Sequence, residues 1–216
     1  MTNAILELAN IARRQCGLFT LAQAKQLGFK KNNSTYYQKT GKWKKATEGS
    51  SGIYEFCGLD LDYTGENLRQ IWLAYLWAFD ASGGPGAIIS HESALYIHDL
   101  SDLLPNQVHM TPIQEGRFRR RSTPPTAIEI HNCEVTDADY EEMESGLLVM
   151  TPIAALRNLL QEDRQSWEHI ESGFREAVEK GKITLGELNK LRGYTETHKQ
   201  LIHSWFPKYF KLDKEV

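Results

Sequence analysis

Cysteine is scarce in this chain, since Cys16, Cys57 and Cys133 are far apart and form no Cys-x-x-Cys pair. This scarcity excludes a disulfide-rich scaffold and argues against a zinc site built from thiolates. Long apolar runs are missing too, because the longest, Ile71 to Phe79, is far shorter than the roughly 20 residues that cross a bilayer. The first residues contain no basic segment followed by an apolar stretch. We therefore expect a cytoplasmic protein without an export signal or a membrane span.

Apolar and charged residues are present in ordinary proportions. With 41% hydrophobic, 10% aromatic and 25% charged residues, the composition predicts a folded globular protein and excludes a disordered or fibrous one. A length of 216 residues fits one medium domain or two small ones. The formal net charge of -3 would by itself argue against a nucleic-acid partner.

That small net charge hides a strong asymmetry along the chain. Residues 1–50 contain nine Lys or Arg and two Glu, a formal charge of +7, so the rest of the chain carries -10 to reach the total of -3. Such a division of charge is typical of a protein in which one module binds a polyanion and the other does not. Charge alone also fits a solvated basic face without a partner.

Local signals in the basic segment predict three short helices. Apolar residues at helical spacing indicate a helix over 3–15. Thr20 and Gln23 form a Thr-x-x-Gln capping box at the start of a second helix, which ends before Gly28. Cap residues then predict a third helix over 32–40. Two short helices joined by a tight glycine turn are typical of a helix-turn-helix.

A predicted hairpin follows these helices. Basic and apolar residues alternate over 42–46, a polar turn follows, and residues 53–56 return as a second strand. Together these signals predict a winged helix-turn-helix DNA-binding domain over residues 1–58, with the third helix in the major groove and the wing lysines on phosphates. We expect Tyr37 in the core. The residues expected to contact DNA are Lys31, Asn33, Thr35, Tyr36, Gln38, Lys39, Lys42, Lys44 and Lys45.

The acidic remainder, residues 64–216, is predicted to form a larger α+β domain. An apolar stripe indicates a buried helix over 66–80, and Ser90 is a plausible N-cap for a helix that contains His91 and His98. Strands are expected near 108–111, 127–131 and 147–150, followed by several helices. The glycine-rich segment 82–86 lacks the lysine of a phosphate-binding loop, so we expect a plain loop.

Catalytic motifs are not evident in this remainder. His91 and His98 do not form the His-Glu-x-x-His pair of zinc hydrolases, so hydrogen-bonded structural histidines are expected, with no bound metal and no cofactor. The acidic run 137–144 is expected to be a solvated turn and helix. The basic run 117–121 fits either a solvated loop or a nucleic-acid contact. We therefore expect no catalytic residue and no enzyme.

Two alternatives stay open at this point. One is a metal-dependent nuclease or hydrolase that uses His91, His98, His109 and His131 together with the acidic run. The other is an interaction protein whose basic module binds RNA or an acidic partner. The nuclease alternative requires a convergence of side chains that the sequence does not reveal.

Three segments of the chain resemble the AbiEi family, the antitoxin and transcriptional-regulator component of type IV AbiE toxin-antitoxin systems, which act in abortive infection against phage. The first runs from Gly17-Leu18-Phe19-Thr20 to Gly52-Ile53-Tyr54. The second is Ser90-His91-x-Ser93-Ala94-Leu95, followed by Val108-His109-Met110-Thr111-Pro112. The third is Val149-Met150-Thr151-Pro152, which opens a helix, with Gly181-Lys182-Ile183-Thr184 farther on.

The resemblance implies a repressor of its own operon that binds inverted repeats of double-stranded promoter DNA as a monomer or weak dimer. It also implies a C-terminal domain that counteracts a nucleotidyltransferase-like toxin, often without a stable complex. The residues implied for operator contact are the predicted DNA-binding ones. Ala154 and Asn158 depart from the Arg and Asp that relatives commonly have in the helix after Thr151-Pro152, and this departure bears on antitoxin function more than on the fold.

Overall fold

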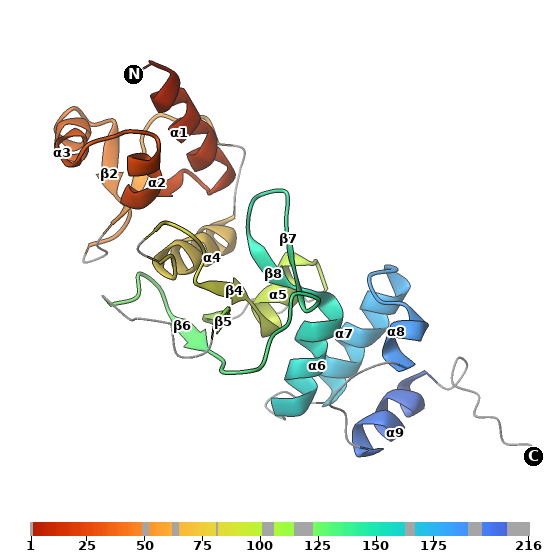
Figure 1. Ribbon diagram of the computed structural model, residues 1–216. Coiled ribbons are helices and arrows are strands. Elements are labelled where there is room, and N and C mark those ends of the chain that lie inside the picture. Colours follow the sequence, from red (N-terminus) through yellow and green to blue (C-terminus); the bar gives the residue numbers. More distant parts are fainter. Residues whose placement is uncertain are drawn as a thin grey trace, which may run out of the picture.

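A computed structural model describes residues 2–48, 52–61, 65–80, 82–100, 106–114, 123–162, 167–189 and 196–206. These residues form helices and two separate sheets, which confirms the mixed α+β class. No helix in the described ranges is long and apolar enough to cross a membrane. Figure 1 shows the elements along one long axis, with the first helices at one end and α9 near the other.

The N-terminal unit, residues 2–56, contains three helices and a three-stranded sheet. Its elements are α1 (Thr2–Arg14), β1 (Leu18–Thr20), α2 (Leu21–Gln26), α3 (Lys31–Lys39), β2 (Trp43–Lys45) and β3 (Ile53–Phe56). The sheet order is β1-β3-β2, and β3 pairs antiparallel with both neighbours. The expected hairpin of β2 and β3 is therefore confirmed, and β1 is added at its other edge.

The predicted signals at the ends of α2 are confirmed. The backbone N–H of Gln23 donates to Thr20 Oγ1 over 3.1 Å, and the backbone N–H of Thr20 donates to Gln23 Oε1 over 2.8 Å. This reciprocal pair satisfies two amides that the first turn of a helix leaves unbonded. Gly28 ends the segment with a φ of 87°, a conformation that L side chains rarely adopt.

Aromatic side chains form the core of the N-terminal unit. Trp43 on β2 is 1% exposed, and its ring centroid lies 4.8 Å from that of Phe19 on β1. The Tyr37 ring on α3 lies 4.7 Å from the Trp43 ring, so Tyr37 packs against this core as expected. Because Trp43 contacts both the sheet and α3, it fixes the position of α3 relative to the hairpin.

The second part of the chain is built around a five-stranded sheet with the order β6-β5-β4-β8-β7. The pairs β4–β5 and β7–β8 are antiparallel, whereas β4–β8 and β5–β6 are parallel. The strands are β4 (Ala87–Ile89), β5 (Val108–Pro112), β6 (Ile128–Ile130), β7 (Tyr140–Glu142) and β8 (Leu148–Met150). The helices are α4 (Glu66–Trp77), α5 (His91–Ile97), α6 (Pro152–Glu162), α7 (Trp167–Glu179), α8 (Leu185–Asn189) and α9 (Glu196–Trp205).

The acidic run 137–144 differs from its prediction. Residues 140–142 form strand β7, which pairs with β8, so the expected helix is wrong. Asp139 is not simply solvated either, because its carboxylate accepts hydrogen bonds from the Thr136 backbone over 2.9 Å and from Arg157 Nη1 over 2.8 Å. Pairing with a buried neighbouring strand outweighed the weak strand preference of the glutamates.

Helix α4 connects the two sheets through its buried face. Ile71, Trp72 and Tyr75 are each at most 2% exposed, which confirms the predicted apolar stripe as core. The same core cluster includes Leu18 and Ile53 of the N-terminal unit. The segment 82–86 is a loop, as expected, and the backbone N–H groups of Ser82 and Gly84 in it donate to the preceding Asp80 carboxylate.

Two predicted features lie outside the described residues. They are the basic run 117–121 and residues 62–64, at the boundary between the two predicted domains.

Candidate nucleic-acid interface and histidine cluster

The predicted DNA-contacting residues of α3 divide into two groups. Thr35, Tyr36 and Lys39 are exposed, and Tyr36 is 59% exposed although it is a large aromatic residue. Asn33 and Gln38 are half-buried and bond to their own helix. Asn33 Oδ1 accepts from the Lys30 backbone over 2.6 Å, and Gln38 Nε2 donates to the Ser34 carbonyl over 3.0 Å.

These local bonds change the expectation for Asn33 and Gln38. An amide that already caps or braces its own helix has fewer donors and acceptors left for a base edge. Among the predicted contact residues of α3, Thr35, Tyr36 and Lys39 are therefore the exposed ones. The side chain of Lys31, also predicted to contact DNA, lies outside the described part of the structure, although its backbone begins α3.

The three predicted wing lysines have different surroundings. Lys42 and Lys45 are exposed, and the Lys42 ammonium lies 5.8 Å from the centroid of the Tyr37 ring. Lys44 forms an ion pair of 2.8 Å with Glu55 on the neighbouring strand, and this carboxylate raises the pKa of Lys44. Lys42 and Lys45 are thus available to contact a DNA phosphate. Lys44 would have to leave the Glu55 carboxylate before it could bind a phosphate.

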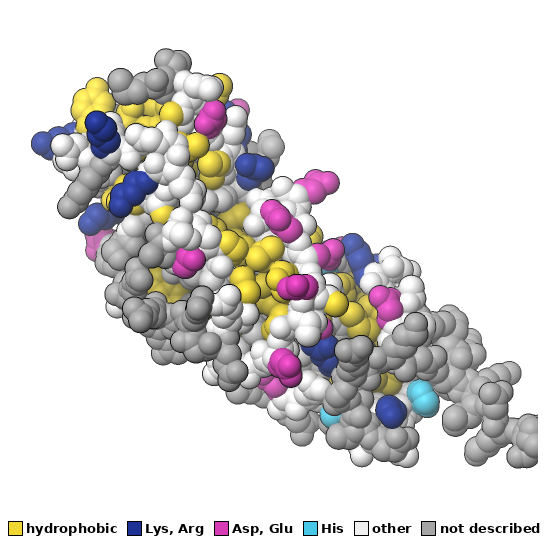
Figure 2. Space-filling view, in the orientation of Figure 1, with side chains coloured by type: hydrophobic (Ala, Val, Ile, Leu, Met, Phe, Trp, Pro, Cys, Tyr) yellow, Lys and Arg dark blue, Asp and Glu magenta, His cyan; other side chains and the backbone are white. Residues whose placement is uncertain are grey.

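Charge is distributed unevenly over the visible face of the molecule. In Figure 2, Lys and Arg side chains gather over the N-terminal unit, whereas Asp and Glu side chains spread over the middle of the molecule. This agrees with the opposite charges of the two parts of the sequence.

A second cluster of polar side chains lies in the larger part of the molecule, where three of the four candidate histidines meet. His91 begins α5, His109 lies on β5 and His131 directly follows β6. The His91 and His131 rings are stacked with centroids 3.6 Å apart, and the His109 ring lies 5.1 Å from that of His131. His98 does not join them, because its Nε2 lies 2.9 Å from the Met150 carbonyl.

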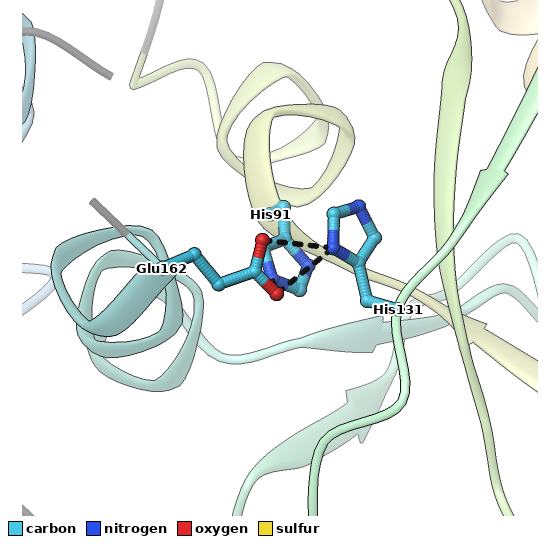
Figure 3. A group of neighbouring side chains, drawn as sticks. All are labelled: His91, His131 and Glu162. Carbon is cyan, nitrogen blue, oxygen red and sulfur yellow. Dashed lines mark hydrogen bonds and ion pairs between the residues drawn. The ribbon is translucent and has the colours of Figure 1, made fainter. Parts of the chain in front are cut away.

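Carboxylates complete this cluster, and Glu162 at the end of α6 is the central one. Its Oε1 lies 3.2 Å from His91 Nε2 and 3.0 Å from His131 Nδ1. Figure 3 shows the Glu162 carboxylate beside both rings. Glu92 Oε2 lies 3.4 Å from His109 Nδ1 on the other side. The acidic run 137–144, which the nuclease alternative invoked, is not the source of these carboxylates.

Hydrogen bonds extend the cluster into its surroundings. Thr111 Oγ1 donates to Ser90 Oγ over 3.0 Å, and Ser90 Oγ lies 2.9 Å from His91 Nδ1. Ser90 occupies the predicted N-cap position, but its side chain makes no capping bond and holds His91 instead. His131 Nε2 lies 2.9 Å from His109 Nδ1, so one of these two nitrogens carries the shared proton.

Burial and hydrogen bonds shift the pKa values of three side chains in this cluster, His109, His131 and Glu162. His91 is fully buried, and His131 and His109 are 5% and 8% exposed. Burial lowers the pKa of His131 and of His109, which favours neutral imidazoles. The hydrogen bond from His91 is the largest cause that lowers the pKa of Glu162, to about 2, which favours the carboxylate.

Glu162, Glu92 and Glu129 are the carboxylates of the cluster that sequence reasoning missed, and Glu129 Oε2 lies 3.8 Å from His109 Nδ1. Glu162 is the only acidic residue of α6 and belongs to no recognisable motif, so its sequence context carries no signal. A weak signal was present for the histidines, because His109 lies within one predicted strand and His131 ends another. Bringing them together required the sheet order, in which β4 and β6 flank β5.

Comparison of the sequence with protein-family models and with curated proteins finds no match.

Proposed function

We propose that the protein is a transcriptional regulator whose N-terminal unit is a winged helix-turn-helix that binds promoter DNA. The observation that carries this proposal is the element order α1-β1-α2-α3-β2-β3 together with the sheet order β1-β3-β2. In a winged helix the second helix of the pair, here α3, enters the major groove, and the hairpin of β2 and β3 lies beside it against the phosphate backbone.

The exposed chemistry of α3 supports this role. Thr35 and Tyr36 offer hydroxyl groups that can hydrogen-bond base edges, and Lys39 offers an ammonium group in the last turn. No acidic residue lies in α3 to repel the DNA. We assign base contacts first to Thr35 and Tyr36, because Asn33 and Gln38 bond to their own helix.

Electrostatics supports one orientation of the molecule on DNA. Lys42 and Lys45 on and beside β2 are exposed and would neutralise phosphates next to the groove that α3 enters. The charge of -10 on the remainder of the chain opposes close approach of that part. The basic end would therefore face the DNA, and the acidic part would point away from it.

The resemblance to the AbiEi family extends the proposal to the rest of the chain. On that basis the protein represses its own promoter at inverted repeats and counteracts a nucleotidyltransferase-like toxin without catalysis of its own. Support comes from the Ser90–Leu95 and Val149–Pro152 segments that carry the resemblance. Co-expression with a neighbouring toxin gene tests it, since growth should be restored by the full chain but not by residues 1–58 alone.

Promoter selectivity is the direct test of the DNA-binding role. Fluorescence anisotropy with the full-length protein would compare a duplex from upstream of its own gene with a scrambled duplex of equal composition. The wild-type protein is expected to prefer the promoter. Thr35→Ala and Tyr36→Ala are each expected to reduce that preference by about 1–3 kcal/mol for every base contact that the substitution removes.

A matched control separates base contact from a general loss of binding. Thr197→Ala removes an exposed threonine hydroxyl from α9, far from the N-terminal unit, and should leave both affinities unchanged. Equal affinity of the wild-type protein for promoter and scrambled DNA would contradict the proposal, as would tighter binding to an RNA of the same sequence.

A further inference from the structure

The histidine cluster has the composition of a metal centre. His91 Nε2, His131 Nδ1 and a Glu162 oxygen all lie within 4.8 Å of one another, and they come from the start of α5, the end of β6 and the end of α6. We propose that these three side chains bind one divalent transition-metal ion of the zinc class. Two imidazoles and one carboxylate are the ligands that such ions take in proteins, whereas Mg²⁺ and Ca²⁺ prefer oxygen alone.

The distances from the Glu162 carboxylate to the two ring nitrogens fit a common ion. Two donors about 2.1 Å from one ion, at the angles of a tetrahedral or octahedral site, are separated by about 3.0–3.4 Å. Glu162 Oε1 lies 3.2 Å from His91 Nε2 and 3.0 Å from His131 Nδ1. An ion could replace the shared protons once the two stacked rings, whose planes meet at 19°, turn so that both nitrogens point toward it.

The partners of the two rings suit the protonation state that a metal needs. A ligating nitrogen carries no proton, so the other nitrogen of each ring must donate a hydrogen bond. His91 Nδ1 lies 2.9 Å from Ser90 Oγ, which can accept it, and His131 Nε2 lies 2.9 Å from His109 Nδ1, which can accept it when neutral. Both rings thus have an outer hydrogen-bond partner on the side away from Glu162.

The backbone at His91 supports the same interpretation. His91 has a φ of 51°, which is uncommon for a residue other than glycine, and its side chain is fully buried. A left-handed backbone conformation raises the energy of a residue other than glycine. It persists where the surrounding structure fixes it, often at ligand sites. Here the strained residue directs an imidazole toward Glu162 and His131 (Figure 3).

Metal binding at this place would also stabilise the fold. The three ligands lie far apart in sequence, and β6 is an edge strand of its sheet. One ion would join the end of this edge strand to two helices. Because the ligands are assembled only in the folded chain, binding free energy would add to folding free energy.

Titration of the full-length protein tests the proposal. After removal of metal with a chelator, Zn²⁺ would be added in competition with a chromophoric chelator, and bound metal would be counted by elemental analysis. We expect one ion per chain, undiminished by excess Mg²⁺, and a rise in the thermal unfolding temperature on addition of Zn²⁺. Glu162→Gln and His131→Gln should each weaken binding at least ~10-fold and abolish most of that rise.

His98→Gln is the matched control, because it also removes a buried imidazole but one bonded to the Met150 carbonyl. It should keep the metal affinity of the wild-type protein. Glu162→Gln preserves side-chain shape, so it keeps the test decisive where His131→Gln fails to fold. Absence of stoichiometric Zn²⁺ binding, or equal affinity in wild type and Glu162→Gln, would overturn the proposal.

Discussion

Lys44 and Glu55 face each other across the hairpin of β2 and β3, and their ion pair measures 2.8 Å. Glu55 also accepts from Arg69 of α4 over 3.1 Å, so one carboxylate binds two cations. It is an anion on the strand next to the lysines that we assign to phosphate contact. Glu55 is therefore positioned to limit the affinity of the hairpin for DNA.

Glu55→Gln is expected to strengthen binding to any DNA duplex. The substitution removes a negative charge and leaves Lys44 free to contact phosphate. Because exposed ion pairs contribute little energy, the affinity for DNA should rise roughly two- to fivefold. Anisotropy titrations at constant salt would measure it. Glu179→Gln makes the same charge change at an exposed position on α7 and should have little effect. Weaker DNA binding by Glu55→Gln would show that the pair serves to position the hairpin.

Trp43→Ala is expected to destabilise the N-terminal unit by about 3–5 kcal/mol, because it leaves a large cavity between the sheet and α3. Trp43 is 1% exposed and packs against Phe19 and Tyr37. Urea unfolding followed by circular dichroism would measure the loss. Leu6→Ala is the control, because Leu6 is 57% exposed and its truncation should cost less than about 0.5 kcal/mol. A similar small cost for Trp43→Ala would contradict the core assignment.

Asp139→Asn is expected to destabilise the protein near neutral pH by roughly 1.5–3 kcal/mol, since the carboxylate accepts bonds from Thr136 and Arg157. Burial raises the pKa of Asp139, but these bonds outweigh it and hold the pKa below its ordinary value. Their stabilisation is therefore complete above the ordinary aspartate pKa of about 3.9 and is lost as the pH falls through the lower folded value.

Urea unfolding at a series of pH values would test this dependence. The difference in unfolding free energy between wild type and Asp139→Asn should shrink as the medium becomes acidic. Asp60→Asn, at an exposed position, should behave like the wild type throughout. A difference that grew in acid would have the wrong sign for a carboxylate with a lowered pKa.

Features set by neighbouring residues were predictable from the sequence. The capping box of Thr20 and Gln23, the glycine stop at Gly28 and the paired strands β2 and β3 each depend on a few adjacent side chains. The same locality bears on one assignment that the sequence suggested. Asn33 and Gln38 were assigned to DNA by residue type, but short polar side chains in helices also bond to nearby backbone, as these do.

Features set by the order of strands were not predictable. Glu141 and Glu142 favour a helix or turn in isolation, yet pairing with β8 makes them part of a strand. His91, His109, His131 and Glu162 meet because β4 and β6 flank β5 and because α6 ends beside them. A single sequence contains no periodicity that reports such long-range contacts.

The dependence of DNA binding on salt tests the central claim most directly. Promoter affinity of the full-length protein would be measured over a range of salt concentrations for the wild type, for Lys42→Gln with Lys45→Gln, and for the control Lys182→Gln with Lys199→Gln. The wing variant should bind more weakly, with a salt slope shallower by up to about 0.9 for each phosphate that the protein no longer neutralises. An unchanged slope and affinity in the wing variant, matching the control, would contradict the assignment of the N-terminal unit as the DNA-binding module.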